Sequence, residues 1–361
     1  MPATKTQTRH NRGVVAVVFY ISGHGFGHAS RSIEVINALV DRRPDLRVVV
    51  RSQVAPWLFE RTARPTVELE PVETDTGVAQ IDSLHLDERE TLARARAFMN
   101  TMPARLALEA SRLRELDATL VIADLPPLGI AAATAAGLPA VAFGNFTWDW
   151  IYGGYQGGQD LAEAIGNMYR DTTLALRLPM SGGFATMPVV RDLPFVARRS
   201  AREPAEVRRA FGFAADERLV LVSFGGYGLR SDARRLAAIA DYRVLAPETF
   251  DEQSIYAKGY RYEDLVRAVD VVVSKPGYGI ISECLANHTA LLYTSRGRFR
   301  EYDVLVAAMP RFLRCAFIGH DDLFAGRWQT HLDALLAQPT PPESPATNGA
   351  DVATAALLEM I

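Results

Sequence analysis

The chain has 361 residues, of which 48% are hydrophobic and 22% charged, so it is long enough for two domains that each bury a core. Its 39 Lys and Arg residues are balanced by 42 Asp and Glu residues, and the net charge is -3. Binding to a nucleic-acid backbone needs a basic surplus, so we expect no nucleic-acid partner. Two cysteines without C-x-x-C spacing cannot build a disulfide framework, which favours a reducing compartment.

Two apolar segments resemble export or membrane signals and fail as such. Residues 14–21 follow several basic residues, as in a signal peptide, but a glycine-rich turn replaces the cleavage site. Residues 129–144 are interrupted by Gly137 and Pro139 and fall short of the about 20 apolar residues that span a bilayer. We therefore expect a cytoplasmic protein with at most peripheral membrane contact.

Short apolar runs alternate with longer helical patterns along most of the chain, which is typical of parallel strands joined by crossover helices. The expected fold class is therefore α/β. In the first half, strands are expected at residues 14–21, 46–50, 119–123 and 140–143, and helices at 28–40 and 90–116.

The proline-rich, aperiodic segment 187–203 is the expected interdomain linker. The pattern then restarts, with helices near 204–211, from Ser231 and at 263–269, and strands at 219–223, 270–274 and 290–294. A proline-rich tether, residues 338–345, precedes an amphipathic helix at 351–361. The expected units are residues 1–190, residues 204–337, and the tether with its helix at 338–361.

The first candidate site is the turn SGHGFGH, residues 22–28, between the first strand and the first helix. Gly25 and Gly27 leave backbone amides bare, and the helix dipole adds positive potential for an anion or a developing oxyanion. The turn departs from the dinucleotide fingerprint because His28 follows the last glycine and no acidic residue ends the second strand. A tight connection would also explain the glycines, but not two histidines.

His24 and His28 are four residues apart, but the intervening glycines disfavour a helix and a third ligand is missing, so no metal site is expected. Imidazole titrates near neutral pH and suits a general base that takes a proton from a hydroxyl nucleophile. His28 is the preferred base because it opens the helix, where the dipole keeps it neutral.

Two further glycine-rich turns follow strands in the second half. In LVSFGGYG, residues 221–228, no Lys-Ser/Thr pair follows as in a P-loop, but the amides can hold a diphosphate. In DVVVSKPGYG, residues 270–279, the turn leads into a helix that carries Glu283. That carboxylate either accepts hydrogen bonds from a ribose cis-diol or complements the helix dipole.

An aromatic run of period two, Phe146, Trp148, Trp150 and Tyr152, suits either a half-exposed wall that stacks on a sugar or the edge of the core. Both interpretations stay open from the sequence.

Three motifs carry a resemblance to a known family. They are SGHGFGHASR at 22–31, DLPP at 124–127 with NFTWDWIY at 145–152, and KPGYGIISE at 275–283 followed by RFRE at 298–301. In this order they resemble the glycosyltransferase-like N-terminal region of plant-type L-arabinokinases and its free-standing bacterial relatives. More distantly, they are similar to GT-B glycosyltransferases, including the lipid-linked N-acetylglucosaminyl transferase of cell-wall synthesis. The resemblance extends from Val14 to about Gln338.

The resemblance implies a GT-B fold, in which two Rossmann-like parallel-sheet domains face a central cleft and the C-terminal helix packs back on the N-terminal domain. The base would be His28, with His24 as the second candidate. Acceptor contacts would come from the first domain, at Gly25, Gly27, Asp124, Asn145 and Trp148. Donor contacts would come from the second domain, at Gly225, Gly226, Gly228, Tyr260, Arg261, Gly277, Gly279, Glu283, Arg300 and Glu301. Tyr227 is bulkier than the small residue of many relatives, and the ATP motif of the sugar-kinase half is missing.

The expected activity is inverting, metal-independent transfer of a sugar from a nucleotide diphosphate sugar, a UDP-sugar by resemblance, to a hydroxyl acceptor, with no cofactor. Backbone amides and Arg300 would stabilise the departing diphosphate. Two alternatives remain open: a nucleotide-sugar hydrolase, which the G-x-G-H-x-x-R turn at 25–31 also resembles, and a non-catalytic module that binds sugar nucleotides.

Overall fold

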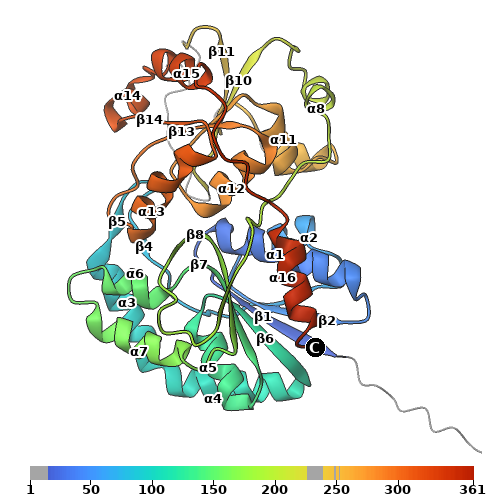
Figure 1. Ribbon diagram of the computed structural model, residues 1–361, viewed down its shortest axis with the longest axis vertical. Coiled ribbons are helices and arrows are strands. Elements are labelled where there is room, and N and C mark those ends of the chain that lie inside the picture. Colours follow the sequence, from blue (N-terminus) through green and yellow to red (C-terminus); the bar gives the residue numbers. More distant parts are fainter. Residues whose placement is uncertain (1–14, 226–238, 248, 252) are drawn as a thin grey trace, which may run out of the picture.

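The computed structural model describes residues 15–225, 239–247, 249–251 and 253–361, which form two α/β domains stacked along the long axis (Figure 1). Within these residues, the first domain has a seven-stranded sheet in the order β3-β2-β1-β6-β7-β8-β9, and the second a five-stranded sheet in the order β11-β10-β12-β13-β14. The described pairings of both sheets are parallel. The two parallel-sheet domains expected from the sequence are confirmed.

The strands of the first sheet are β1 (Ala16–Ile21), β2 (Arg47–Arg51), β3 (Glu68–Glu70), β6 (Ala118–Asp124), β7 (Ala140–Phe146), β8 (Leu174–Gly182) and β9 (Val190–Asp192). The helices of this domain are α1 (Phe26–Arg42), α2 (Pro56–Thr62), α3 (Glu88–Asn100), α4 (Met102–Glu115), α5 (Pro127–Ala136), α6 (Trp148–Gly153) and α7 (Gln159–Tyr169). Every residue of β1 and β7 is buried, as expected for central parallel strands that helices cover on both faces.

The strands of the second sheet are β10 (Arg218–Val222), β11 (Tyr242–Leu245), β12 (Val271–Ser274), β13 (Ala290–Tyr293) and β14 (Cys315–Phe317). Its helices are α8 (Pro204–Ala210), α10 (Gln253–Ala257), α11 (Tyr262–Ala268), α12 (Tyr278–Asn287), α13 (Arg300–Ala308), α14 (His320–Ala325) and α15 (Gln329–Leu336). The helix expected from Ser231 lies outside the described residues. None of the helices described here is long and apolar enough to cross a membrane.

The structure corrects or completes three expectations about elements. The single helix at 90–116 is two helices, because Pro103 stands in the first turn of α4 and cannot continue α3. The linker at 187–203 contains the edge strand β9, which pairs with β8 although its three residues are exposed. The aromatic run leaves β7 at Phe146 and continues into helix α6 at Trp148, and Phe146, Trp148 and Tyr152 are buried, as the core-edge interpretation expects.

A hairpin of the first domain, residues 79–87, reaches across to the second domain. It consists of β4 (Ala79–Gln80) and β5 (Leu86–Asp87), which pair antiparallel and lie between the two sheets in Figure 1. Leu84 in its loop is 2% exposed and packs in the core of the second domain with Val220 and Val222. We call this segment the inserted hairpin.

The chain crosses back to the first domain at its C-terminal end. Phe195 is joined to the returning segment by hydrogen bonds from Phe195 N to Ala346 O (3.0 Å) and from Gly349 N to Phe195 O (2.9 Å). Helix α16 (Gly349–Leu358) then lies beside α1, as Figure 1 shows. Thr354 donates a hydrogen bond to Val35 O at 3.4 Å, so α16 contacts the first domain directly.

Leu357→Ala is expected to lower the free energy of unfolding by about 2–5 kcal/mol, because truncating a buried leucine leaves a cavity. Leu357 is 0% exposed on α16. The control Glu359→Ala removes an exposed contact to Arg191 at 3.2 Å and should cost at most about 1 kcal/mol. Urea unfolding measures both variants, and equal small effects would contradict a stabilising role for α16.

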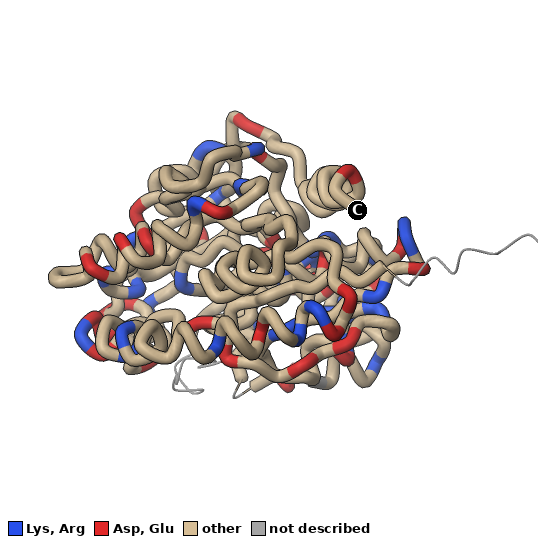
Figure 2. The backbone as a smooth tube through the Cα atoms, turned by 90° about the horizontal axis from the view of Figure 1, so that it is seen from below, with Lys and Arg blue, Asp and Glu red and all other residues tan. Residues whose placement is uncertain are grey.

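Charged residues are distributed over both domains. In the view of Figure 2, basic and acidic positions are interspersed, and neither kind gathers on one side. This distribution agrees with the nearly balanced counts of the sequence, 39 basic and 42 acidic residues.

Candidate functional site

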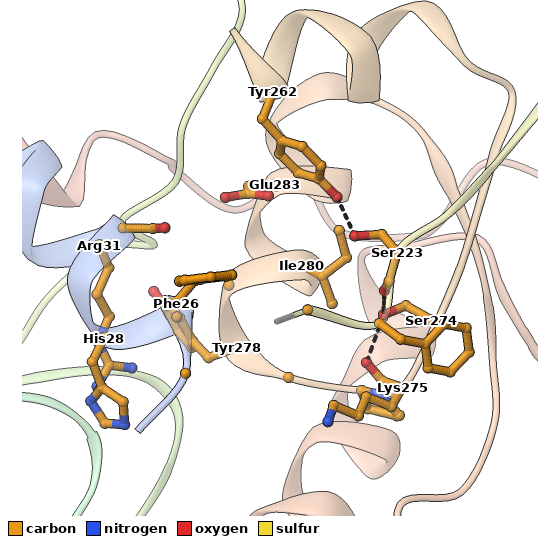
Figure 3. A pocket seen from close by; sticks show the side chains of 18 of the residues that line it. Phe26, His28, Arg31, Ser223, Tyr262, Ser274, Lys275, Tyr278, Ile280 and Glu283 are labelled. Carbon is orange, nitrogen blue, oxygen red and sulfur yellow. Dashed lines mark hydrogen bonds between the residues drawn. The ribbon is translucent and has the colours of Figure 1, made fainter. Parts of the chain in front are cut away.

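A cavity of about 540 Å³ lies between the two domains and is lined by both (Figure 3). One wall is the turn after β1, and the other is formed by the turns after β10 and β12. The strand order reverses beside β1 and beside β10, and ligands of open α/β sheets bind outside the carboxyl ends of strands at such points. The walls approach closely at two glycines, since a Cβ on Gly279 would lie 3.6 Å from Gly27 Cα.

His28 and Asp124 form a buried pair at the first-domain wall. His28 is the third residue of α1, and its Nδ1 lies 2.8 Å from Oδ1 of Asp124 at the end of β6. Arg31 Nε and Ser32 Oγ each donate to Oδ2 of the same carboxylate at 2.8 Å. Burial alone would raise the pKa of Asp124, but Arg31 and His28 lower it to about 2. Because the ionised carboxylate accepts only, the tautomer with its proton on Nδ1 satisfies this contact and leaves a lone pair on Nε2.

Aromatic side chains fix the orientation of the His28 ring. Phe146 meets it edge-on at 5.5 Å between centroids, and Trp148 stacks on it at 6.2 Å. The Trp148 indole N–H in turn donates to Asp75 Oδ2 at 3.0 Å. Burial raises the pKa of Asp75 to about 6. A ring held in this way is ordered before any ligand binds.

His24 lines the same cavity but has a different electrostatic setting. Burial, followed by the positive potential of His28, Arg296 and Lys275, lowers the pKa of His24 to about 3. At neutral pH this imidazole is uncharged and a weak base, because an efficient general base has a pKa near the working pH. The surroundings therefore disfavour His24 as a general base.

On the second-domain wall, Glu283 is 4% exposed and its Oε1 accepts a hydrogen bond from Arg198 Nε at 2.6 Å. Burial raises the pKa of Glu283, and Arg198 opposes this shift. Nearby, the Tyr262 hydroxyl donates to Ser223 Oγ at 2.6 Å, as Figure 3 shows. These side chains give this wall several hydrogen-bonding atoms for a polar ligand.

Two cations, Lys275 and Arg296, face the cavity beside the start of α12. Lys275 Nζ donates to Ser83 O of the inserted hairpin at 2.7 Å, and burial together with Arg296 lowers the pKa of Lys275 to about 7. Arg296 lies 4.2 Å from the Phe299 ring centroid, and its buried Nε has no hydrogen-bond partner among the described residues. Arg296 Nη1 also lies 3.7 Å from Glu301 Oε2, and the remaining donors of the two cations can bind an anionic ligand group.

The structure brings most of the expected site residues together. The cavity is lined by His24, Gly25, Gly27, His28, Gly225, Gly277, Gly279, Glu283 and Glu301. Asp124, Asn145 and Trp148 lie behind this lining, where Asn145 Nδ2 donates to Glu301 Oε1 at 2.7 Å. Gly226 and Gly228 fall outside the described residues.

Three expected donor residues do not line the cavity. Arg300 opens α13 instead of lying in a loop, and its exposed guanidinium donates to Trp150 O at 2.6 Å. Tyr260 packs against Phe211 at 5.5 Å between ring centroids, and the exposed Arg261 precedes α11. Tyr262, the first residue of α11, lines the cavity, whereas Tyr260 and Arg261 do not.

Sequence reasoning missed Arg198, Lys275 and Arg296. Lys275 lies within a motif that the sequence singles out, and few lysines occur in this arginine-rich chain, which was the available signal. Arg198 lies in the expected linker, where a charged residue is ordinary. Among the described residues, no group of three His, Cys, Asp or Glu side chains is placed to hold a metal ion.

The chain is similar to curated proteins. It is 29% identical over 380 residues to L-arabinokinase of Arabidopsis thaliana, a match that covers 98% of this chain and 36% of that protein. It is 28% identical over 151 residues to UDP-N-acetylglucosamine--N-acetylmuramyl-(pentapeptide) pyrophosphoryl-undecaprenol N-acetylglucosamine transferase of Clavibacter michiganensis subsp. michiganensis, covering 38% of this chain and 40% of that protein. The matches thus cover well under two thirds of these relatives. No protein-family model matches the chain.

Solved structures share the fold. The glycotransferase of kitacinnamycin matches with a TM-score of 0.56 at 15% identity, covering 96% of this chain and 99% of that chain. Medicago truncatula UGT71G1 complexed with UDP-glucose matches with a TM-score of 0.58 at 12% identity, covering 96% and 98%. The expected GT-B fold is confirmed.

Proposed function

We propose that this chain, which has the GT-B fold and is homologous to L-arabinokinase and to a UDP-N-acetylglucosamine transferase, is an inverting, metal-independent glycosyltransferase. It moves a sugar from a nucleoside diphosphate sugar, of the UDP class, to a hydroxyl acceptor. The observation that carries the proposal is the His28–Asp124 pair, at 2.8 Å, on the opposite wall from Glu283 and Lys275. The UDP-glucose bound to one structural neighbour supports the donor class.

In the proposed reaction, the acceptor hydroxyl binds beside Nε2 of His28. His28 takes the hydroxyl proton while the oxygen attacks the anomeric carbon from the face opposite the leaving group, which inverts that carbon. The bond from the anomeric carbon to the phosphate oxygen breaks, and its electron pair leaves with the diphosphate. Asp124 stabilises the imidazolium that forms, as an ionised carboxylate does in a catalytic triad.

The leaving diphosphate needs positive charge where its negative charge develops. Arg300, the side chain expected from the sequence, donates to Trp150 O at 2.6 Å and is not among the residues that line the cavity, so we do not assign it this role. In its place we assign Lys275, Arg296 and the backbone amides at the start of α12, all on the second-domain wall. The amides of a helix N-terminus favour phosphate.

The function is tested by incubating the protein with a panel of nucleotide sugars and measuring free nucleoside diphosphate with and without hydroxyl acceptors. Release that depends on an acceptor is the expected result. Release without an acceptor would indicate a hydrolase, and binding without release a non-catalytic module. Turnover is expected to persist in EDTA, and its loss would contradict metal independence.

The affinity for UDP-glucose is expected to fall as the pH rises above 7, by up to about tenfold per pH unit. The reason is that Lys275, with a pKa lowered to about 7, is charged below this pH and loses its proton above it. Lys275→Met should bind UDP-glucose more weakly and without this pH dependence. Calorimetric titration from pH 6 to 8.5 measures both, with the exposed Lys258→Met as the control.

A further inference from the structure

The segment that connects the domains is fixed along α12 on both sides of Arg198. The Val196 N–H donates to the Tyr278 hydroxyl at 3.0 Å, and the Ser200 N–H donates to Asn287 Oδ1 at 2.9 Å. Asn287 Nδ2 also donates to Arg198 O at 3.0 Å. The backbone of Arg198 is therefore held by the helix that carries Glu283, and its side chain starts from a defined point.

The Arg198 guanidinium contacts one oxygen of the Glu283 carboxylate through two of its nitrogens. Its Nε lies 2.6 Å from Oε1, and Nη2 contacts the same oxygen. Oε2 of Glu283 has no hydrogen-bond partner in the part of the chain that the structure describes, and both residues line the cavity. The guanidinium also lies 5.1 Å from the ring centroid of Tyr262. One carboxylate oxygen is thus fixed and the other is left for a ligand.

Arg198 is the positively charged group that opposes protonation of Glu283. Burial and the neighbouring Glu263 raise the pKa of Glu283, whereas Arg198 lowers it. Glu263 Oε2 lies 4.0 Å from Arg198 Nη1, and Arg261 Nη1 lies 3.8 Å from Glu263 Oε1. Glu34 of α1 belongs to the same group of carboxylates, and burial raises its pKa to about 7. Without Arg198, like charges would crowd a buried carboxyl group.

We propose that Arg198 is a positioning residue for donor recognition, which holds Glu283 so that its Oε2 accepts a hydrogen bond from a ribose hydroxyl of the nucleotide. The inference rests on the proposed function and adds to it a residue of the interdomain segment. It makes recognition of ribose depend on an arginine that does not itself contact the sugar.

The test is the preference for ribose over deoxyribose, measured by calorimetry with UDP against 2′-deoxy-UDP and with GDP against 2′-deoxy-GDP. Wild-type protein is expected to prefer the ribonucleotide of at least one pair by about tenfold, which corresponds to 1.4 kcal/mol. Arg198→Met should reduce this preference to within about twofold at pH 6, and Glu283→Gln should remove it at every pH. Arg198→Lys, which retains a charge, should retain part of it.

A pH titration separates positioning from a general loss of structure. In Arg198→Met the pKa of Glu283 rises further, so only part of the ribose preference should return as the pH is raised from 6 to 9 and Glu283 ionises, because the contacts that orient the carboxylate are still missing. The matched control is Arg202→Met, in the same segment, where an exposed guanidinium pairs with Glu206 at 2.9 Å. This control should keep the wild-type preference throughout.

Two results would overturn the inference. An Arg198→Met variant with the wild-type preference at pH 6 would show that Glu283 needs no partner. Wild-type protein with no ribose preference in either pair, but with acceptor-dependent release of nucleoside diphosphate, would leave the proposed function standing and remove the ribose contact. Absence of both nucleotide binding and release would contradict the function itself.

Discussion

His28→Ala is expected to lower kcat by about 10²–10⁴-fold, the range for loss of a general base, with little change in nucleotide-sugar affinity. The affinity is retained because the donor wall belongs to the other domain. Steady-state kinetics together with calorimetric binding of UDP-glucose measure the two effects separately.

The control for this prediction is His24→Ala, which removes the other histidine of the same turn. Its pKa of about 3 makes His24 a weak base, so the variant should keep far more activity. If His24→Ala abolishes turnover and His28→Ala does not, the assignment of the base is wrong. Melting temperatures are needed for both, since His28 packs against Phe146 and Trp148.

Asp124→Asn is expected to lower both activity and stability. The amide leaves the buried Arg31 without its carboxylate partner, and breaking a buried ion pair costs about 3–5 kcal/mol. It also removes the charge that orients His28, so kcat should fall by about 10²–10⁴-fold. Urea unfolding and steady-state kinetics measure the two losses.

The stability that Asp124 contributes depends on pH in a defined direction. Asp124 has a pKa of about 2 in the folded protein, below the ordinary aspartate value of 3.8, so its stabilising contribution is present above pH 4 and lost as the pH falls towards 2. The stability difference between wild type and Asp124→Asn should therefore shrink over that range. The control is Asp160→Asn, which breaks an exposed pair with Arg96 at 2.8 Å and should cost at most about 1 kcal/mol.

The sequence predicted best those elements whose buried residues follow one another as an uninterrupted apolar run. The run at 270–274 identified β12 because a central parallel strand is apolar on both faces. Strand β9 has no such run, since its three exposed residues pair only at an edge. A local sequence pattern indicates burial, whereas the formation of β9 depends on its pairing with β8, which no local pattern shows.

The same reasoning applies to the candidate site. His28 and Glu283 could be identified because each lies next to a glycine-rich turn that marks a strand end. The pairing of Arg198 with Glu283 and of Lys275 with Ser83 joins residues 85 and 192 positions apart, and composition or spacing carries no record of such contacts. Arg300 was misplaced because a residue at the start of a helix was expected in a loop.

Separating the two domains would cost free energy because the inserted hairpin is anchored in the core of the second domain. If the domains swing apart far enough to withdraw the hairpin, Leu84 leaves the core of the second domain, and exposing a buried leucine costs about 1.5–3 kcal/mol. Lys275 also loses its bond to Ser83. This cost alone would hold such an open form to roughly one molecule in ten to one in a hundred. Shortening the Leu84 side chain would lower this cost, although Leu84 is not among the residues that line the cavity.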